Sequence, residues 1–155
     1  MIRVKKILCI IAIIFAVLFI SLFTACEMLQ LLSYDENIPR DYVDCTEYFD
    51  ENGFQDYTDY CWYQYADTNR VKLPAQYEII TQAEIPFIKS YFDDFQGWMS
   101  AENRLDQYDF DQVCINVGDS YFLNSKYEGH RKFINYDLYF FDKETARLYF
   151  IHNNI

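Results

Sequence analysis

The chain has 155 residues and a mass of 18.7 kDa, which is enough for one domain and too little for two of ordinary size. Hydrophobic residues make up 52% of it, which excludes a disordered or low-complexity protein. The net charge of −11 argues against nucleic acid as a partner, because a protein that neutralises phosphates needs to be basic.

The N-terminal residues have the pattern of a secretory signal. Arg3, Lys5 and Lys6 precede an uninterrupted apolar run, residues 7–20. Such a run enters the bilayer while the cations stay on the cytoplasmic side. We therefore predict three regions: an N-terminal apolar signal helix or membrane segment (residues 1–25), a tether (residues 26–39) and a single extracytoplasmic domain (residues 40–155).

The apolar run ends in Phe23-Thr24-Ala25-Cys26, which resembles the lipobox of bacterial lipoproteins. In that family the signal peptide is cut before a diacylated cysteine, so the resemblance implies lipid attachment, such as palmitate, at Cys26 and a place on the outer face of the cytoplasmic membrane. Phe23 departs from the family pattern, which has Leu or another aliphatic residue there. Two alternatives are an uncleaved anchor, since residues 7–25 approach the roughly 20 residues that span a bilayer, and ordinary secretion.

Acidic and aromatic residues are concentrated just after the tether. Residues 1–25 carry three of the 13 cations and none of the 24 acids, so the rest of the chain has a net charge of −14. That charge opposes adsorption to an anionic membrane, and anchorage would have to come from a lipid or the apolar helix. We predict that an acidic, Tyr-rich surface within residues 42–65 binds a glycan or protein ligand. The alternative is that these tyrosines line a half-buried sheet.

Periodicity predicts one helix and several strands in the exported part. Residues 57–66 alternate as a strand does, and residues 77–80 form another extended piece. Thr81 and Glu84 have capping-box spacing, whereas Pro86 favours a helix start nearer to itself. The apolar residues that repeat at helical spacing are Phe87, Ile88, Tyr91, Phe92, Phe95, Trp98 and Met99.

Two hairpins are predicted after the helix. The first joins residues 113–117 to 121–124 around Gly118-Asp119, and the second joins residues 136–142 to 147–152. The fold class is therefore α+β: one main amphipathic helix packed on an antiparallel sheet of about four to five strands, in a cystatin-like or NTF2-like order. That order is architecture by analogy and carries no function.

The C-terminal strands also carry a resemblance. Tyr139-Phe140-Phe141-Asp142 and residues 148–154, together with the lipobox-like start, are similar to small uncharacterised lipoproteins of Gram-positive bacteria. The likeness extends over the helix and the C-terminal strands. It implies export and lipid anchorage, and it implies no activity.

Three cysteines remain once Cys26 is acylated and residues 1–25 are removed: Cys45, Cys61 and Cys114. An odd number cannot all pair. Export permits oxidation, so a Cys45–Cys61 disulfide is one candidate, and two free thiols are the other. Cys114 is expected to be a buried thiol in a core strand. Because no CxxC or Cys/His ligand spacing occurs, we expect no structural zinc and no cofactor.

A calcium loop is a minor hypothesis. With Gly53 at the sixth position of an EF-hand loop, the ligands would include Asp50, Asn52, Asp56 and Asp59. Tyr48 would then occupy the first position, where a carboxylate is needed. A solvated acidic loop is the better interpretation, and we expect no metal site.

No catalytic motif occurs in the chain. The two histidines, His130 in a polar loop and His152 at the end of a strand, belong to no nucleophile elbow, HExxH or phosphate loop. The leading hypothesis is thus a non-enzymatic, lipid-anchored binding domain of unknown ligand. The alternative is a small hydrolase or isomerase with a pocket between helix and sheet, around His152, Asp137 or Tyr149.

Overall fold

The computed structural model describes residues 35–48, 57–125 and 133–154. The predictions about the signal helix, Cys26 and His130 fall outside these residues, as does most of the predicted calcium loop. The chain separates into two units, Met1–Glu36 and Asn37–Ile155, and the fold below is that of the second unit.

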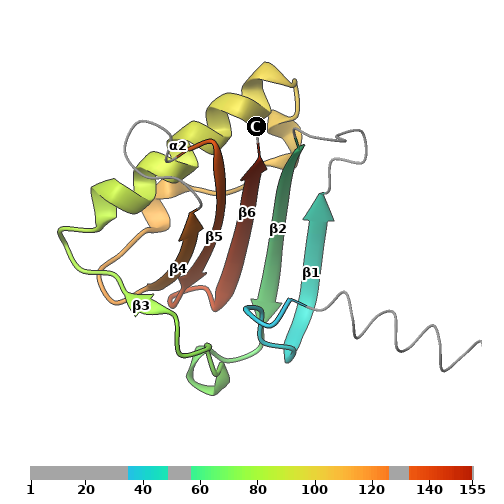
Figure 1. Cartoon of the computed structure of the whole chain (residues 1–155). Helices are drawn as coiled ribbons and strands as arrows, with labels where there is room; N and C mark the ends of the chain where they lie inside the picture. Colours follow the sequence, from blue (N-terminus) through green and yellow to red (C-terminus); the bar gives the residue numbers. More distant parts are fainter. Residues whose placement is uncertain (1–34, 49–56, 126–132, 155) are drawn as a thin grey trace, which may run out of the picture. The chain divides into compact units, whose positions relative to one another are not determined.

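A six-stranded antiparallel sheet carries one long helix on one of its faces (Figure 1). The strand order across the sheet is β1-β2-β6-β5-β4-β3. The elements are β1 (Tyr42–Tyr48), β2 (Tyr57–Tyr65), β3 (Glu78–Ile79), α2 (Ile85–Ala101), β4 (Ser120–Ser125), β5 (Asn135–Asp142) and β6 (Arg147–Asn154), with short 3-10 turns η1 (Thr68–Arg70), η2 (Leu105–Gln107) and η3 (Gln112–Cys114). The predicted α+β class is therefore confirmed.

The predicted number of strands is wrong, because the described part of the chain contains six strands and not four to five. Strand β1 was missed because it is an edge strand with five of its seven residues exposed, so its sequence does not alternate between apolar and polar. Its pairing with β2 is interrupted by an irregularity between Tyr42 and Asp44, beside the exposed Val43. Such bulges are typical of sheet edges.

The first predicted hairpin is also wrong. Residues 112–114 form η3, and β4 pairs with β3 and β5 instead of with residues 113–117. The N–H of Gly118 donates to the Ile80 carbonyl at 2.9 Å, and the N–H of Ile80 donates to the Asp119 carbonyl at 2.8 Å. The chain turns at Gly118, whose φ of 97° suits glycine. The second hairpin, β5–β6, is confirmed.

Helix α2 begins at Ile85, immediately before Pro86. Glu84 is its N-cap, and its carboxylate accepts a hydrogen bond from the backbone N–H of Thr81 at 2.8 Å. Pro86 lies in the first turn, where its missing N–H costs no helical bond, so the later of the two predicted starts is confirmed. No helix in the described part of the chain is long and apolar enough to cross a membrane.

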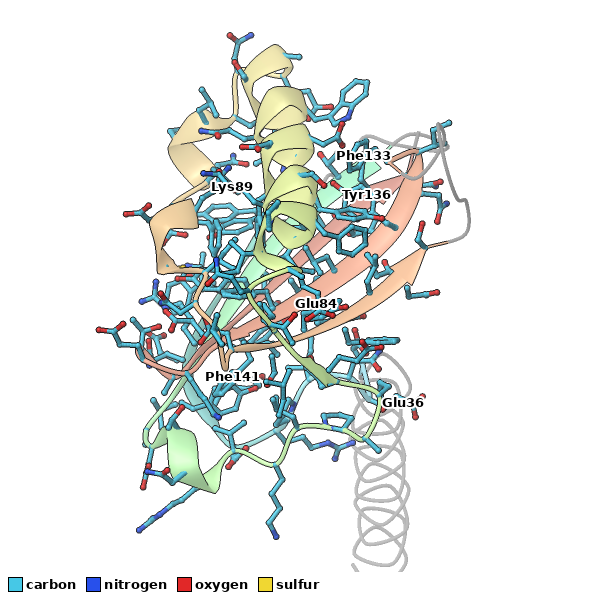
Figure 2. The ribbon with its side chains drawn as sticks, turned by 90° about the vertical axis from the view of Figure 1, so that its left-hand side faces the viewer. Glu36, Glu84, Lys89, Phe133, Tyr136 and Phe141 are labelled. Atoms are coloured by element: carbon cyan, nitrogen blue, oxygen red, sulfur yellow. The ribbon has the colours of Figure 1, made fainter. Side chains whose placement is uncertain are left out.

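The inner face of the sheet, defined as the face that α2 covers, is closed by aromatic packing. Phe92 stacks on Phe110 with 3.9 Å between ring centroids, and Phe110 meets Tyr149 of β6 edge to face. Tyr91 packs against Tyr136 at 4.9 Å, and Figure 2 shows Tyr136 beside the helix. The buried residues of α2 are Ile88, Tyr91, Phe92, Phe95 and Met99, whereas Phe87 and Trp98 are 38% and 37% exposed at the margins of the stripe.

A second apolar cluster covers part of the outer face. Tyr63, Phe141 and Leu148 are buried there beneath Ile38 and partly buried Leu73. The tyrosine hydroxyls at the border of this cluster find acceptors. Tyr63 donates to Glu47 at 2.9 Å, Tyr65 to the Pro39 carbonyl at 2.9 Å, and Tyr77 to the Asn37 carbonyl at 2.9 Å.

Buried tyrosines make the fold sensitive to alkali. Burial raises the pKa of Tyr60, Tyr63 and Tyr136 well above the usual value of about 10. The folded chain then keeps these protons at a pH where the unfolded chain has released them. The contribution of these tyrosines to the free energy of unfolding is therefore fully present below pH ~10. Above that pH it falls by about 1.4 kcal/mol per pH unit for each such tyrosine.

We predict cooperative unfolding above pH ~10, with tyrosinate absorbance and loss of circular dichroism appearing together. Tyr136→Phe should make the free energy of unfolding depend less steeply on pH above that value. Ionisation of the buried tyrosines in a chain that stays folded would contradict the prediction, whereas exposed tyrosines such as Tyr42 can ionise without unfolding.

Candidate functional site

Beyond the second apolar cluster, the outer face presents a row of polar side chains. Register places Asn124 of β4 opposite Asp137 of β5, Asp137 opposite His152 of β6, and His152 opposite Asp59 of β2. Directly paired residues point to the same face of a sheet, so these four form one line across four strands. We call them the polar row.

Hydrogen bonds connect three members of the polar row. His152 Nδ1 lies 2.5 Å from Asp137 Oδ1, and Asn124 Nδ2 donates to the other carboxylate oxygen, Oδ2, at 3.0 Å. The His152 side chain is 13% exposed and that of Asp137 is 26% exposed. The carboxylate thus holds both neighbours, and the row is preorganised rather than free to rotate.

A row of rings lies next to the polar row, one step along the strands. Phe122, Tyr139 and Phe150 are opposite one another on β4, β5 and β6. The rings of Phe122 and Tyr139 stack at 5.6 Å, and those of Tyr139 and Phe150 stack at 4.8 Å with 29° between planes. The ring faces are turned toward one another, Tyr139 is 4% exposed, and Tyr77 packs against both Phe122 and Tyr139, so the row belongs to the edge of the second apolar cluster.

Two of the three residues predicted for an enzyme pocket come together. His152 and Asp137 are hydrogen-bonded on the outer face, whereas Tyr149 is 5% exposed on the inner face, in contact with Phe110. The space between helix and sheet holds the inner cluster, whose rings meet at van der Waals distance. In the described part of the chain these rings occupy space between α2 and the sheet, and a pocket at that place stays a prediction.

Three of the six rings that the structure describes in residues 42–65 are buried. Tyr60, Tyr63 and Tyr65 are 0%, 5% and 2% exposed, so they line the sheet as the alternative interpretation expected. Tyr42 is 38% exposed, and Trp62 is half-buried under the Arg147 guanidinium, 4.4 Å from its ring centre. Asp44 and Glu47 of the same range are exposed, and ligand binding by this surface stays a prediction.

The predicted Cys45–Cys61 disulfide is absent from the structure, where both cysteines are free thiols. Cys45 lies opposite Tyr63, and Cys61 lies opposite Glu47. The two cysteines are therefore diagonal neighbours, for which Cα atoms lie about 7–8 Å apart, beyond the roughly 4.4–6.8 Å of a disulfide. Cys114 is a half-buried free thiol at the end of η3 rather than in a core strand.

The predicted calcium ligands cannot be assessed as a set. Asp59 lies in the polar row, while Asp50, Asn52, Gly53 and Asp56 are outside the described residues. Within residues 35–48, 57–125 and 133–154, no group of three His, Cys, Asp or Glu side chains is arranged to hold a metal ion.

Sequence reasoning identified His152 and Asp137 but missed Asn124 and the row that they form. The alternation of β6 already grouped His152 with Phe150 on one side of the strand. The sequence did not reveal which strands are neighbours in the sheet. Strand β2 precedes the helix in the chain, yet it lies between β1 and β6 in the sheet. No local signal in the sequence specifies that pairing.

Thiol reactivity tests the arrangement of the cysteines. Burial raises the pKa of Cys61 to about 12 and also raises that of exposed Cys45, to which Glu47 and Asp44 contribute. We predict that iodoacetamide at pH 8 alkylates Cys45 at least about tenfold faster than Cys61, because Cys61 is inaccessible as well as protonated. Peptide mapping by mass spectrometry measures both rates. A Cys45–Cys61 cross-linked peptide in a non-reduced digest would contradict the structure.

Comparisons of the chain with protein-family models, with curated proteins and with solved structures find no match. Inference about function therefore depends on the residues of the chain and on the geometry of the sheet. The feature that combines polar groups in a fixed order is the polar row with its adjoining rings, although His152 and Tyr139 are themselves largely buried.

Proposed function

We propose that this protein is an exported, lipid-anchored binding module that holds a protein ligand on the outer face of its sheet, at the polar row. The observation that carries the binding role is the polar row, in which Asp137 holds Asn124 and His152 in fixed positions beside Phe150. Anchorage at Cys26 is supported by the sequence of residues 1–26. Those residues lie outside the described part of the chain.

The chemistry of the surface favours a donor-rich protein segment over a glycan. Asp59 and Asp137 supply carboxylates that accept hydrogen bonds, and the chain as a whole carries a net charge of −11. A glycan platform needs exposed ring faces for sugars to stack on, and the faces of Phe122, Tyr139 and Phe150 are used by one another. A glycan ligand is an outcome that the binding experiment below distinguishes.

A second candidate function, an extracytoplasmic hydrolase or isomerase, is favoured by one contact. A histidine oriented by a carboxylate is an arrangement that general-base catalysis uses. A reaction would then take place on the outer face, at His152, and not beneath α2. The cystatin-like or NTF2-like order stays a prediction about architecture and adds nothing to either candidate.

Metabolic labelling tests the anchor. Cells that express the wild-type chain or Cys26→Ser are grown with labelled palmitate, and the protein is immunoprecipitated. We predict that the label is present in the wild type and lost in the variant, because the acyl chain is attached through that sulfur. Equal labelling of the two chains would reject lipid attachment at Cys26.

A binding screen tests the polar row. The full-length chain in detergent micelles is presented to arrays of peptides and of glycans, including peptidoglycan fragments, and hits are measured by calorimetry. Asp137→Asn and His152→Gln should each weaken a genuine hit at least about tenfold, or about 1.4 kcal/mol. Asp106→Asn, which makes the same charge change on an exposed residue of η2, should leave the affinity within about twofold.

The outcomes separate the candidates. Binding that is unaffected by both variants of the polar row contradicts this site, and hits confined to glycans contradict a protein ligand. Turnover of a hit peptide or ester that His152→Gln abolishes would establish the hydrolase instead.

A further inference from the structure

A hollow of about 340 Å³ lies on the surface of α2, away from the polar row. It is lined by Asp93, Asp94, Gly97, Trp98 and Ala101. These positions follow helical spacing, and they share no residue with the buried stripe that faces the sheet. The hollow is therefore built on the side of the helix that the fold does not use.

Gly97 keeps this hollow open. A Cβ atom at this position would meet no heavy atom within 4 Å, and its φ is not in the left-handed region. Neither close packing nor backbone conformation therefore requires glycine here. Glycine in a helix interior is nevertheless unfavourable relative to alanine, so the fold tolerates a poor helix former at the floor of the hollow.

The side chains around this floor suit a positively charged group. Trp98 is 37% exposed, and its indole is the aromatic ring that attracts cations most strongly. Asp93 is exposed and makes no ion pair with any residue that the structure describes. Asp94 is half-buried, 3.5 Å from the Tyr136 hydroxyl, which holds its carboxylate at the wall.

The net charge of the chain strengthens this preference. At −11 it attracts cationic groups from a distance and repels anionic ones. The competing cation on the same helix is Lys89, one turn before Asp93, and Figure 2 labels it on α2. Where this lysine neutralises Asp93, the exposed indole of Trp98 still attracts a cation.

We propose that this hollow is a binding site for an arginine side chain of a protein partner. A planar guanidinium can stack on the exposed indole and at the same time donate hydrogen bonds to a neighbouring carboxylate, which a compact ammonium does less well. The absence of a side chain at residue 97 lets the guanidinium approach the helix backbone. This site is separate from the polar row, and either can fail without the other.

Calorimetry with defined peptides tests the proposal. The probes are a blocked glycine pentapeptide with two arginines and its counterpart with citrulline, which has the same shape without the charge. Titrated into the full-length chain in detergent micelles, the arginine peptide should bind with a Kd of about 1 mM or tighter, at least tenfold better than the citrulline peptide.

Matched variants locate the site. Gly97→Leu should weaken binding of the arginine peptide at least tenfold with an equal or higher Tm, because leucine fills the hollow and is a good helix former. Residue 100 is an exposed position of the same helix that does not line the hollow, so Ser100→Leu should change neither the binding of the arginine peptide nor the Tm. Asp93→Asn should weaken binding without a change in helix content, and it keeps the test valid if Gly97→Leu does not fold. In a Trp62→Phe background, binding should change the fluorescence of Trp98.

The proposal is overturned if the wild type shows no saturable binding of the arginine peptide, or binds the citrulline peptide equally well. It is also overturned if Gly97→Leu and Asp93→Asn, when folded, bind as the wild type does. A partner bound at the polar row would still be detected by the Asp137→Asn comparison, so the two proposals fail separately.

Discussion

Five side chains of α2 are buried in the cluster on the inner face of the sheet, and the rest of the structure depends on this contact. Tyr91 meets Tyr136, Phe92 meets Phe140, and Phe110 is inserted between Phe92 and Tyr149. Burying one such side chain contributes roughly 1.5–3 kcal/mol, and a helix of 17 residues would be marginal without it. The contact fixes which face of the sheet is inner. The outer face must therefore be covered by segments of the chain other than α2.

Among the described residues, the second apolar cluster covers part of the outer face. Ile38 and Leu73 cover Phe141 and Leu148, which are almost fully buried. Further along the same strands the side chains change to the stacked rings and then to the polar row. Antiparallel sheets commonly keep one face in contact with water, and here the change occurs within one face.

Tyrosine suits a small domain with two thin clusters. The ring of Tyr60 is buried against Phe95 while its hydroxyl reaches Asp109, and Tyr63 similarly reaches Glu47. A phenylalanine would fill the same space but would leave these border acids without a donor. The many tyrosines of the sequence are thus explained mainly by packing, with the hydroxyls paired at the edges of the clusters.

Local patterns in the sequence determined the helix, the strands β2, β5 and β6, and the side of β6 on which His152 lies, because periodicity depends only on neighbouring residues. They did not determine β1, whose exposed edge has no alternation, or the turn at Gly118, which depends on Ile80 far along the chain. Only the tertiary structure decided that β2 inserts beside β6 and that Asn124, Asp137 and His152 form one row. Strand order and register arise from contacts between distant segments, whose energies no short stretch of sequence contains.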